Sequence, residues 1–221
     1  VMRNKRKEYQ TKTVMLYWIL LIYLVVGYFW PVGGFLAFIC MIGPVALSVF
    51  RGRYWCGHIC PRGSYYDRLV ARFSLNRPIP GFLRTPYFRT FMVLFIFTMF
   101  GVQMYFAWGD WNAMGRVFWL IILVTTIVGT VLGIVYSPRA WCTFCPMGSL
   151  SAWVAPRKRG GAFRNIHVAD ACILCKRCAR VCPMQLKPYE AKGAAAGLMD
   201  PDCIKCGKCV SGCPKKVMEM K

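Results

Sequence analysis

Four long apolar segments precede Ser137, and they limit the possible folds more than any other feature of the sequence. They cover residues 14–30, 32–50, 90–108 and 117–136, and none contains Asp, Glu, Lys or Arg. Each has about the 17 to 25 residues that a helix needs to cross the hydrocarbon core of a bilayer. A soluble protein would have too little polar sequence left to cover four such helices. The sequence therefore predicts an all-α, four-helix transmembrane domain.

Basic residues gather at one end of this predicted bundle. The N-terminal tail and the segment between the second and third apolar runs are rich in Arg and Lys, whereas the two opposite loops offer only Asp110 and Arg116. The positive-inside rule then places both termini in the cytoplasm. We expect a multi-pass protein of the inner (cytoplasmic) membrane with a basic tail (residues 1–13), a membrane domain (14–156) and a cytoplasmic domain (157–221). Trp55 and Trp141 are expected at the cytoplasmic face of the bilayer.

The formal net charge of +21 does not by itself indicate a nucleic-acid-binding protein, because no binding motif of that class accompanies it. Much of this charge is expected to set the topology and to contact anionic lipid head groups. Part of it can offset iron-sulfur clusters, which are anionic once their thiolates are counted.

The C-terminal part contains two copies of the spacing Cys-x2-Cys-x2-Cys-x3-Cys-Pro, in residues 172–183 and 203–214. A cytosolic location makes disulfides unexpected. The spacing is typical of bacterial ferredoxins, in which three cysteines of one run and the fourth of the other bind each [4Fe-4S] cluster. Structural zinc is the alternative. The sequence predicts a small α+β, bacterial-type 2[4Fe-4S] ferredoxin domain with two ligand sets: Cys172, Cys175, Cys178 and Cys213 for the first cluster, and Cys203, Cys206, Cys209 and Cys182 for the second.

Four further cysteines lie in a cassette that occurs twice, directly after the second and fourth apolar segments. Residues 53–64 read RYWCGHICPRGS and residues 139–150 read RAWCTFCPMGSL. Both cassettes emerge on one face of a four-span bundle, so we expect them to converge, in charge-rich surroundings that keep the thiols ionised. They would supply the ligands of a third cluster, [2Fe-2S] or [4Fe-4S]: Cys56, Cys60, Cys142 and Cys145.

Two redox-active dithiols, structural zinc and unligated thiols are the alternatives for these four cysteines. His58, inside the first cassette, is expected to tune a cluster through a hydrogen bond rather than to bind it. Ser64 and Ser149 are expected to cap the short helices that follow the cassettes. Cys40, in the second apolar segment, is expected to be a small apolar side chain.

This arrangement of four spans, two Cys-Pro cassettes and a tandem ferredoxin tail resembles the NapH family of membrane quinol dehydrogenase subunits. It resembles the polyferredoxin parts of NosR-type and CcoG-type proteins more loosely. The resemblance covers nearly the whole chain, and it implies electron transfer between the membrane quinol pool and partner iron-sulfur or cytochrome proteins. The second cassette departs from the family pattern, Cys-x3-Cys-Pro, because it is one residue shorter.

The two histidines, His58 and His167, lie outside the apolar segments, so a bis-histidine b-type haem is not expected. All expected metal lies on the cytoplasmic side, and a diffusing quinone or a partner subunit must therefore carry electrons across the membrane. Candidate quinone contacts are polar side chains in or beside the spans: Gln103, Asp110, Tyr65 and Asp67.

From these features we expect a membrane-bound iron-sulfur subunit that exchanges electrons between the quinone pool and partner redox proteins of a respiratory-type complex. One alternative is a redox sensor, or an assembly factor that reduces a metal for insertion into an oxidase or reductase. Another is a module that passes electrons from a ferredoxin to quinone. The residues leave the direction of electron flow open.

Overall fold

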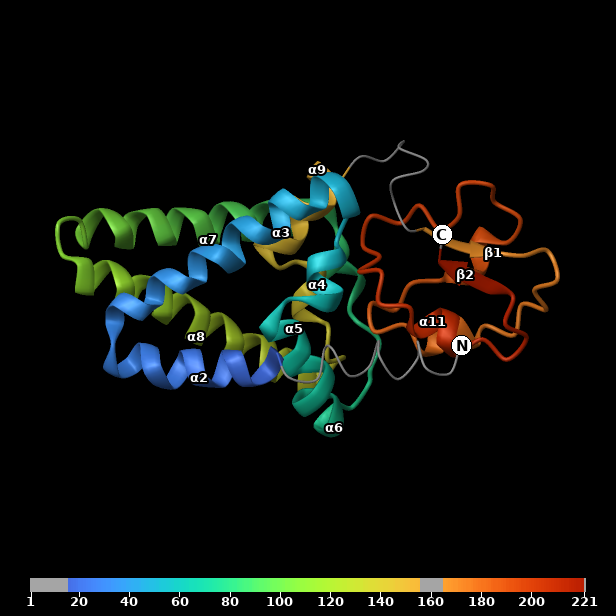
Figure 1. Cartoon of the computed structure of the whole chain (residues 1–221), viewed down its shortest axis with the longest axis horizontal. Coiled ribbons are helices and arrows are strands. Elements are labelled where there is room, and N and C mark those ends of the chain that lie inside the picture. The colour runs from blue at the N-terminus through green and yellow to red at the C-terminus, as the bar shows by residue number, and fades with distance from the viewer. Residues whose placement is uncertain (1–15, 156–164, 221) are drawn as a thin grey trace.

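The computed structural model describes residues 16–155 and 165–220. Its longest elements are four helices that run along the long axis of the molecule (Figure 1): α2 (Leu16–Phe29), α3 (Ala37–Arg51), α7 (Pro86–Phe106) and α8 (Trp111–Val135). A small domain with two short strands lies at one end of these helices (Figure 1). The mostly helical fold agrees with the sequence prediction. The predicted tail and the predicted domain boundary at residue 156 lie outside the described residues.

Among the described residues, three stretches are long and apolar enough to span a membrane: Pro31–Arg51, Pro86–Phe106 and Trp111–Val135. The first joins α3 to the 3-10 helix that precedes it, Pro31–Leu36. Helix α2 is apolar but has only 14 described residues, so the fourth span stays a prediction. Many large apolar side chains on these helices are exposed, among them Ile22, Phe95 and Ile127, as a lipid environment requires.

Glycines let the first hairpin approach helix α8 closely. A Cβ atom at Gly34 would overlap the backbone of Gly115, and one at Gly115 would overlap the carbonyl oxygen of Pro31. Trp119 on α8 also donates from Nε1 to the carbonyl oxygen of Leu24, at 2.9 Å. Small residues at such crossings are typical of helices that pack in membranes.

Short helices connect the bundle to the small domain (Figure 1). After α3 come α4 (Tyr54–His58), α5 (Pro61–Tyr65), a π-helical turn (Tyr66–Val70), α6 (Ala71–Phe73) and a 3-10 helix (Gly81–Arg84). After α8 come a 3-10 turn (Trp141–Thr143) and α9 (Pro146–Val154).

The expected serine caps are wrong. The N-cap residues of α5 and α9 are Cys60 and Cys145, because the proline that follows each cysteine occupies the first helical position. Ser64 and Ser149 lie one turn inside these helices, and both are buried.

Trp141 does not lie at the lipid surface as expected. Its side chain is 3% exposed and packs in a core with Tyr66 and Phe144, the latter at 5.0 Å between ring centroids. Gly129 leaves room for this core, since a Cβ atom there would overlap the Tyr66 hydroxyl group. The cassette therefore folds back under the end of the bundle instead of lying against lipid.

The small domain is built around one two-stranded sheet. Strands β1 (Ile166–Val168) and β2 (Met218–Met220) are antiparallel, with Ile166 opposite Met220. Two single-turn helices, α10 (Arg177–Arg180) and α11 (Lys208–Ser211), each begin two residues after the second cysteine of a ferredoxin motif. A 3-10 helix covers Pro188–Ala191. The sheet pairs the beginning of the domain with its end, so the two cysteine runs share one buried core.

Candidate iron-sulfur centres

The two ferredoxin motifs have the same unusual backbone. Positive φ angles occur at matching positions of the two runs: Leu174 (53°) and Lys205 (54°), Lys176 (57°) and Gly207 (66°), and Gln185 (51°) and Lys216 (55°). Residues other than glycine rarely adopt this left-handed region. Alternating right- and left-handed residues turn successive backbone N–H groups toward one point, which favours an anion such as an iron-sulfur cluster. The shared conformation is therefore what two cluster-binding loops require.

A cavity in the core of the small domain brings together the second predicted ligand set. Its lining includes Cys182 from the first run together with Cys203, Cys206 and Cys209 from the second. Apolar side chains, among them Met184, complete the lining. A cavity lined by four thiols and otherwise apolar groups fits an iron-sulfur cube. The assignment of these cysteines as ligands stays a prediction.

The first predicted ligand set lies less deeply. Cys178 is buried in the shared core, and Cys172 and Cys213 pack against it. Cys175 is exposed. The structure therefore places this candidate centre close to the surface and the other one in the interior.

The two cassettes hold each other through their arginines. Arg53 of the first cassette donates from Nη2 to the carbonyl oxygen of Cys142, at 2.5 Å. Arg139 of the second cassette donates from Nη1 to the carbonyl oxygen of Cys56, at 2.9 Å, and to the Cys142 Sγ, at 3.6 Å. Both arginines are almost fully buried, with exposed fractions of 2% and 1%. The repeated motif thus forms a reciprocal pair in which each arginine contacts the first cysteine of the other cassette.

The glycine of each Cys-Pro-x-Gly-Ser sequence makes room for the opposite arginine. A Cβ atom at Gly63 would overlap the Arg139 guanidinium, and one at Gly148 would overlap that of Arg53. The indole N–H groups of Trp55 and Trp141 occupy matching positions in the two copies, and both are buried without a hydrogen-bond partner. The two cassettes are therefore related by approximate twofold symmetry.

Burial and the neighbouring cysteines act on two of the cassette thiols, Cys60 and Cys142. Burial, together with the neighbouring Cys56 and Cys142, raises the pKa of the Cys60 thiol to about 12. Burial, Cys145 and Cys56 also raise the pKa of Cys142, against the opposing effect of Arg139. The expectation that charged surroundings keep these thiols ionised is therefore wrong for Cys60 and Cys142. Because only a deprotonated cysteine binds iron, cluster binding would have to displace these thiol protons.

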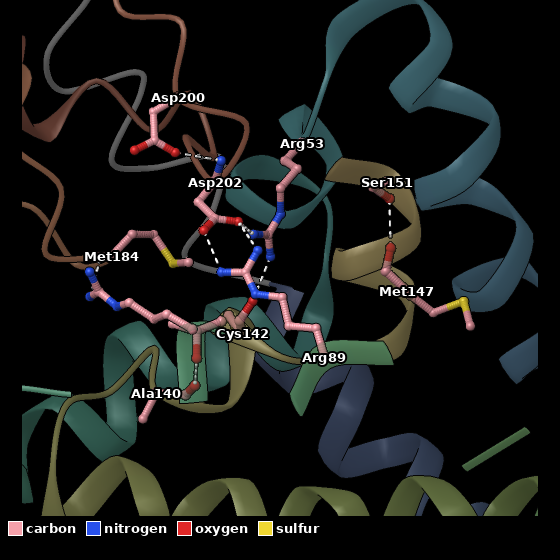
Figure 2. A network of polar contacts seen from close by, with 11 residues as sticks. Arg53, Arg89, Ala140, Cys142, Met147, Ser151, Met184, Asp200 and Asp202 are labelled. Atoms are coloured by element: carbon pink, nitrogen blue, oxygen red, sulfur yellow. Dashed lines mark hydrogen bonds and ion pairs between the residues drawn. The ribbon is translucent and has the colours of Figure 1, made fainter. Parts of the chain in front are cut away.

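Two carboxylates neutralise part of the positive charge around the cassettes. Asp202 accepts from Arg53 Nη1 at 3.0 Å and from Arg89 Nη1 at 2.9 Å (Figure 2). Asp67 accepts from Arg139 Nη2 at 2.8 Å and pairs with Lys208 at 3.3 Å.

Burial disfavours the Asp67 charge, but Arg139 and Lys208 outweigh it and hold the pKa of this carboxyl at about 2. Three buried guanidinium groups, those of Arg53, Arg89 and Arg139, face these two carboxylates. The site therefore carries an excess of positive charge, which suits an anionic iron-sulfur cluster held by four thiolates.

The cassettes lie directly against the second ferredoxin motif of the small domain. A Cβ atom at Gly57 would overlap the carbonyl oxygen of Ile204, and Cys56 and Cys142 pack against the core that contains the cysteine-lined cavity. The 3-10 helix Gly81–Arg84 also contacts the small domain, at the loop after Cys182. There Arg84 Nη2 donates to the carbonyl oxygen of Met184 at 2.8 Å.

His58 stacks on Tyr54, with 3.8 Å between ring centroids and 10° between planes. Its Nδ1 lies 3.1 Å from the carbonyl oxygen of Tyr54. Because a carbonyl oxygen only accepts hydrogen bonds, Nδ1 carries the hydrogen in this pair. Within the described residues, no three His, Cys, Asp or Glu side chains are arranged to hold a single metal ion.

The four candidate quinone contacts do not lie together. Gln103 is in the last turn of α7 and Asp110 caps α8, accepting from the backbone N–H of Asn112 at 2.9 Å. The turn that joins α7 to α8 is at the end of the bundle away from the small domain (Figure 1), and both residues belong to the helix ends that this turn connects. Asp67 is occupied by its ion pairs. Tyr65 lies beside the first cassette, where its hydroxyl accepts from the Thr130 hydroxyl at 3.5 Å.

The ion pairs of Arg53 and Arg89 with Asp202 were not predicted from the sequence, where these arginines count only among the basic residues that indicate the topology. One sequence signal pointed to them. The chain has only 8 acidic residues against 29 Lys and Arg, and Asp202 directly precedes a motif cysteine. An acidic residue at such a position is a candidate partner for a buried arginine.

Comparisons with known proteins agree with the two cysteine-rich regions. A family model described as a 4Fe-4S binding domain matches residues 34–80 and again residues 111–162. A second model, described as a 4Fe-4S dicluster domain, matches residues 164–214. The matches and the three membrane-capable helices fit a membrane ferredoxin, and they support [4Fe-4S] clusters and iron-sulfur electron transfer.

Two curated relatives come from Methanocaldococcus jannaschii. Uncharacterized protein MJ0750 is 24% identical over 79% of this chain and 74% of its own length. Uncharacterized protein MJ0749 is 27% identical over 77% of this chain, which spans about two thirds (65%) of that relative. No solved structure matches.

Proposed function

We propose that this chain is a NapH-type electron-transfer subunit that exchanges electrons between membrane quinone and partner redox proteins of a respiratory-type complex. It would lie in the cytoplasmic membrane, with its cysteine-rich end in the cytoplasm. The concentration of Lys and Arg at that end supports this orientation. The resemblance in cassettes, spans and ferredoxin motifs supports the quinone and partner assignments.

We also propose that Cys56, Cys60, Cys142 and Cys145 bind a third iron-sulfur cluster. The observation that carries this proposal is the reciprocal arrangement of the cassettes, in which two buried arginines each bind the first cysteine of the other cassette and all four cysteines are half-buried. The 4Fe-4S binding model also matches both cassette segments. The two ferredoxin ligand sets, as predicted from the spacing, would bind the other two clusters.

Bound clusters would supply one-electron redox chemistry. The residues of this chain would hold the clusters in position, balance their charge and exclude water from them. Arg53 and Arg139 orient the backbone at the first cysteine of each cassette. Trp141, Phe144 and Tyr66 exclude water from one side of the site. Because the cassettes pack on the cysteine-lined cavity, electrons need cross only a short packed layer between the two centres. Of the two quinone candidates beside the cassettes, Asp67 is held in ion pairs with Arg139 and Lys208, so Tyr65 is the candidate that we propose.

Iron counting tests the third cluster. Purified under anaerobic conditions, the protein should contain about ten iron atoms if the third cluster is [2Fe-2S] and about twelve if it is [4Fe-4S], and the Cys142→Ala variant should contain about eight. Cys40→Ala is the matched control, because Cys40 lies within α3, outside all three cysteine sets, and it should keep the full iron content. About eight iron atoms in the unaltered protein, unchanged by Cys142→Ala, would contradict the proposal.

Reduction by a quinol tests the proposed activity. A short-chain quinol, added to the protein in lipid nanodiscs, should bleach the visible absorption of the clusters and produce EPR signals of reduced iron. Tyr65→Phe should slow this reaction, while Asp110→Asn at the far end of the bundle should leave it unchanged. If dithionite reduces the clusters but no quinol does, the quinone assignment is wrong.

A further inference from the structure

The two ferredoxin loops match in sequence and backbone but differ sharply in exposure. In the inner loop (residues 203–208), Ile204 is 2% exposed and Lys205 is 7% exposed. In the outer loop (residues 172–177), the matching Ile173 and Leu174 are 60% and 48% exposed. The two positions after the first cysteine are thus covered in the inner loop, where they hold Ile204 and Lys205, and open in the outer loop, where both side chains are large and apolar.

The covering of the inner loop comes from the membrane half of the molecule. Helix α4 approaches so closely that Gly57 leaves no room for a Cβ atom against Ile204. At the end of the same loop, Lys208 forms an ion pair with Asp67 of the membrane half. The outer loop follows β1 on the side of the small domain away from the helices (Figure 1). The packing that protects the inner loop is therefore absent, among the described residues, at the outer one.

Basic side chains surround the exposed apolar pair. Lys176, Arg177 and Arg180 are all exposed and lie directly after Cys175, itself exposed. Asp170 is the exposed acidic residue on the preceding segment. An apolar centre with a charged rim is the usual anatomy of a protein-protein interface. The excess of positive charge around the outer loop fits an acidic partner. The outer loop lies at the end of the molecule remote from the membrane helices, so a lipid surface is not its expected partner.

We propose that the outer loop is the docking surface for a small acidic electron-carrier protein, which covers Ile173 and Leu174 as α4 covers the inner loop. This inference rests on the proposed electron-transfer function, and it names the kind of partner. One electron passes between the redox centre of the partner and the centre at Cys172, Cys175, Cys178 and Cys213. One is oxidised and the other is reduced, with no bond or proton exchanged. The inner loop would then connect this entry point to the cassettes.

A reduced, acidic plant-type ferredoxin serves as the probe, and stopped-flow absorbance measures how fast it reduces the intact protein. The second-order rate constant should fall as ionic strength rises, because rim charges steer association. Lys176→Glu/Arg177→Glu should lower the rate constant at low salt about tenfold or more. Lys187→Glu/Lys192→Glu, on the same domain with the same change in charge, should stay within about twofold of the unaltered protein.

Ile173→Ser provides a second test that leaves the charge unchanged. It should lower the rate several-fold without altering the salt dependence, because it removes an apolar contact only. Equal losses in the two double variants, no loss in either, or a rate independent of salt would overturn the docking surface. Reduction by dithionite distinguishes a failure of the docking surface from a failure of the electron-transfer function. If dithionite reduces all variants normally, the electron-transfer function stands whatever the ferredoxin rates show. If dithionite reduces no cluster in the unaltered protein, both proposals are refuted.

Discussion

At the scale of single residues, the buried arginines explain how two cassettes far apart in the sequence form one site. The repeat itself, Arg-x-Trp-Cys, was visible in the sequence, and so was the convergence of its four cysteines. The exchange of partners was not visible, because a repeated motif does not show whether each arginine contacts its own copy or the other one. Only the fold places Arg139 against Cys56 and Arg53 against Cys142.

Arg139→Gln should destabilise the protein strongly. It leaves the half-buried Asp67 carboxylate with Lys208 as its remaining partner and removes the donor to the Cys56 carbonyl group. Breaking a buried ion pair typically costs about 3 to 5 kcal/mol. Thermal unfolding in detergent, with iron content measured in parallel, checks the effect. Arg72→Gln, an exposed position in α6, makes the same charge change and should have little effect.

The double variant Arg139→Gln/Asp67→Asn separates the pair from its surroundings. Since the second substitution removes the stranded carboxylate, the losses should not add, and the two residues should be coupled by about 1 kcal/mol or more. Simple additivity of the two single losses would show that Arg139 acts only through the backbone carbonyl group and the Cys142 sulfur.

At the scale of elements, the long helices were predictable and the short ones were not. The predicted segment 32–50 corresponds to Pro31–Arg51, and 117–136 to Trp111–Val135, because length and apolar composition decide a membrane-capable helix. The short helices after the cassettes depend on local geometry instead. Cys-Pro sets their N-caps, and the sequence pattern alone suggested the serines.

Gly57→Ala tests the contact between α4 and the inner loop. The added methyl group would meet the carbonyl oxygen of Ile204, which belongs to rigid backbone next to Cys203, so the small domain must shift. We expect a lower melting temperature and faster trypsin cleavage of the small domain from the membrane half. Gly81→Ala is the control, since nothing lies within 4 Å of a Cβ atom at that position. Equal behaviour of the two variants would argue against close packing of α4 on this loop.

At the scale of the whole molecule, the half-buried Asp202 joins the two halves. It is the carboxylate shared by Arg53 at the N-cap of α4 and Arg89 in the first turn of α7. Asp202→Asn should leave two buried guanidinium groups without a counter-charge and loosen the small domain, which hydrogen exchange of residues 198–206 would detect as lost protection. Glu190→Gln removes a carboxylate whose ion pair with Lys187 is exposed, and it should have almost no effect.

The topology of the whole chain depends on whether helix α2 crosses the membrane. In the part of the chain that the structure describes, three stretches are long enough by themselves to cross it. An odd number of spans would put the N-terminus on the opposite side from the small domain, whereas the predicted fourth span would put both on the same side. The charge pattern favours four spans, because the tail before α2 is basic like the segment that follows α3.

An epitope tag fused before Val1 distinguishes the two topologies. In inside-out membrane vesicles, trypsin should remove the tag and digest the small domain, and in right-side-out vesicles both should survive. A tag in the exposed α7–α8 turn at Gly109 should show the reverse protection, and it controls for vesicle orientation. Removal of the N-terminal tag from right-side-out vesicles, with the small domain protected, would mean that α2 does not span the bilayer. The first hairpin would then have to fold with α2 lying along the membrane surface.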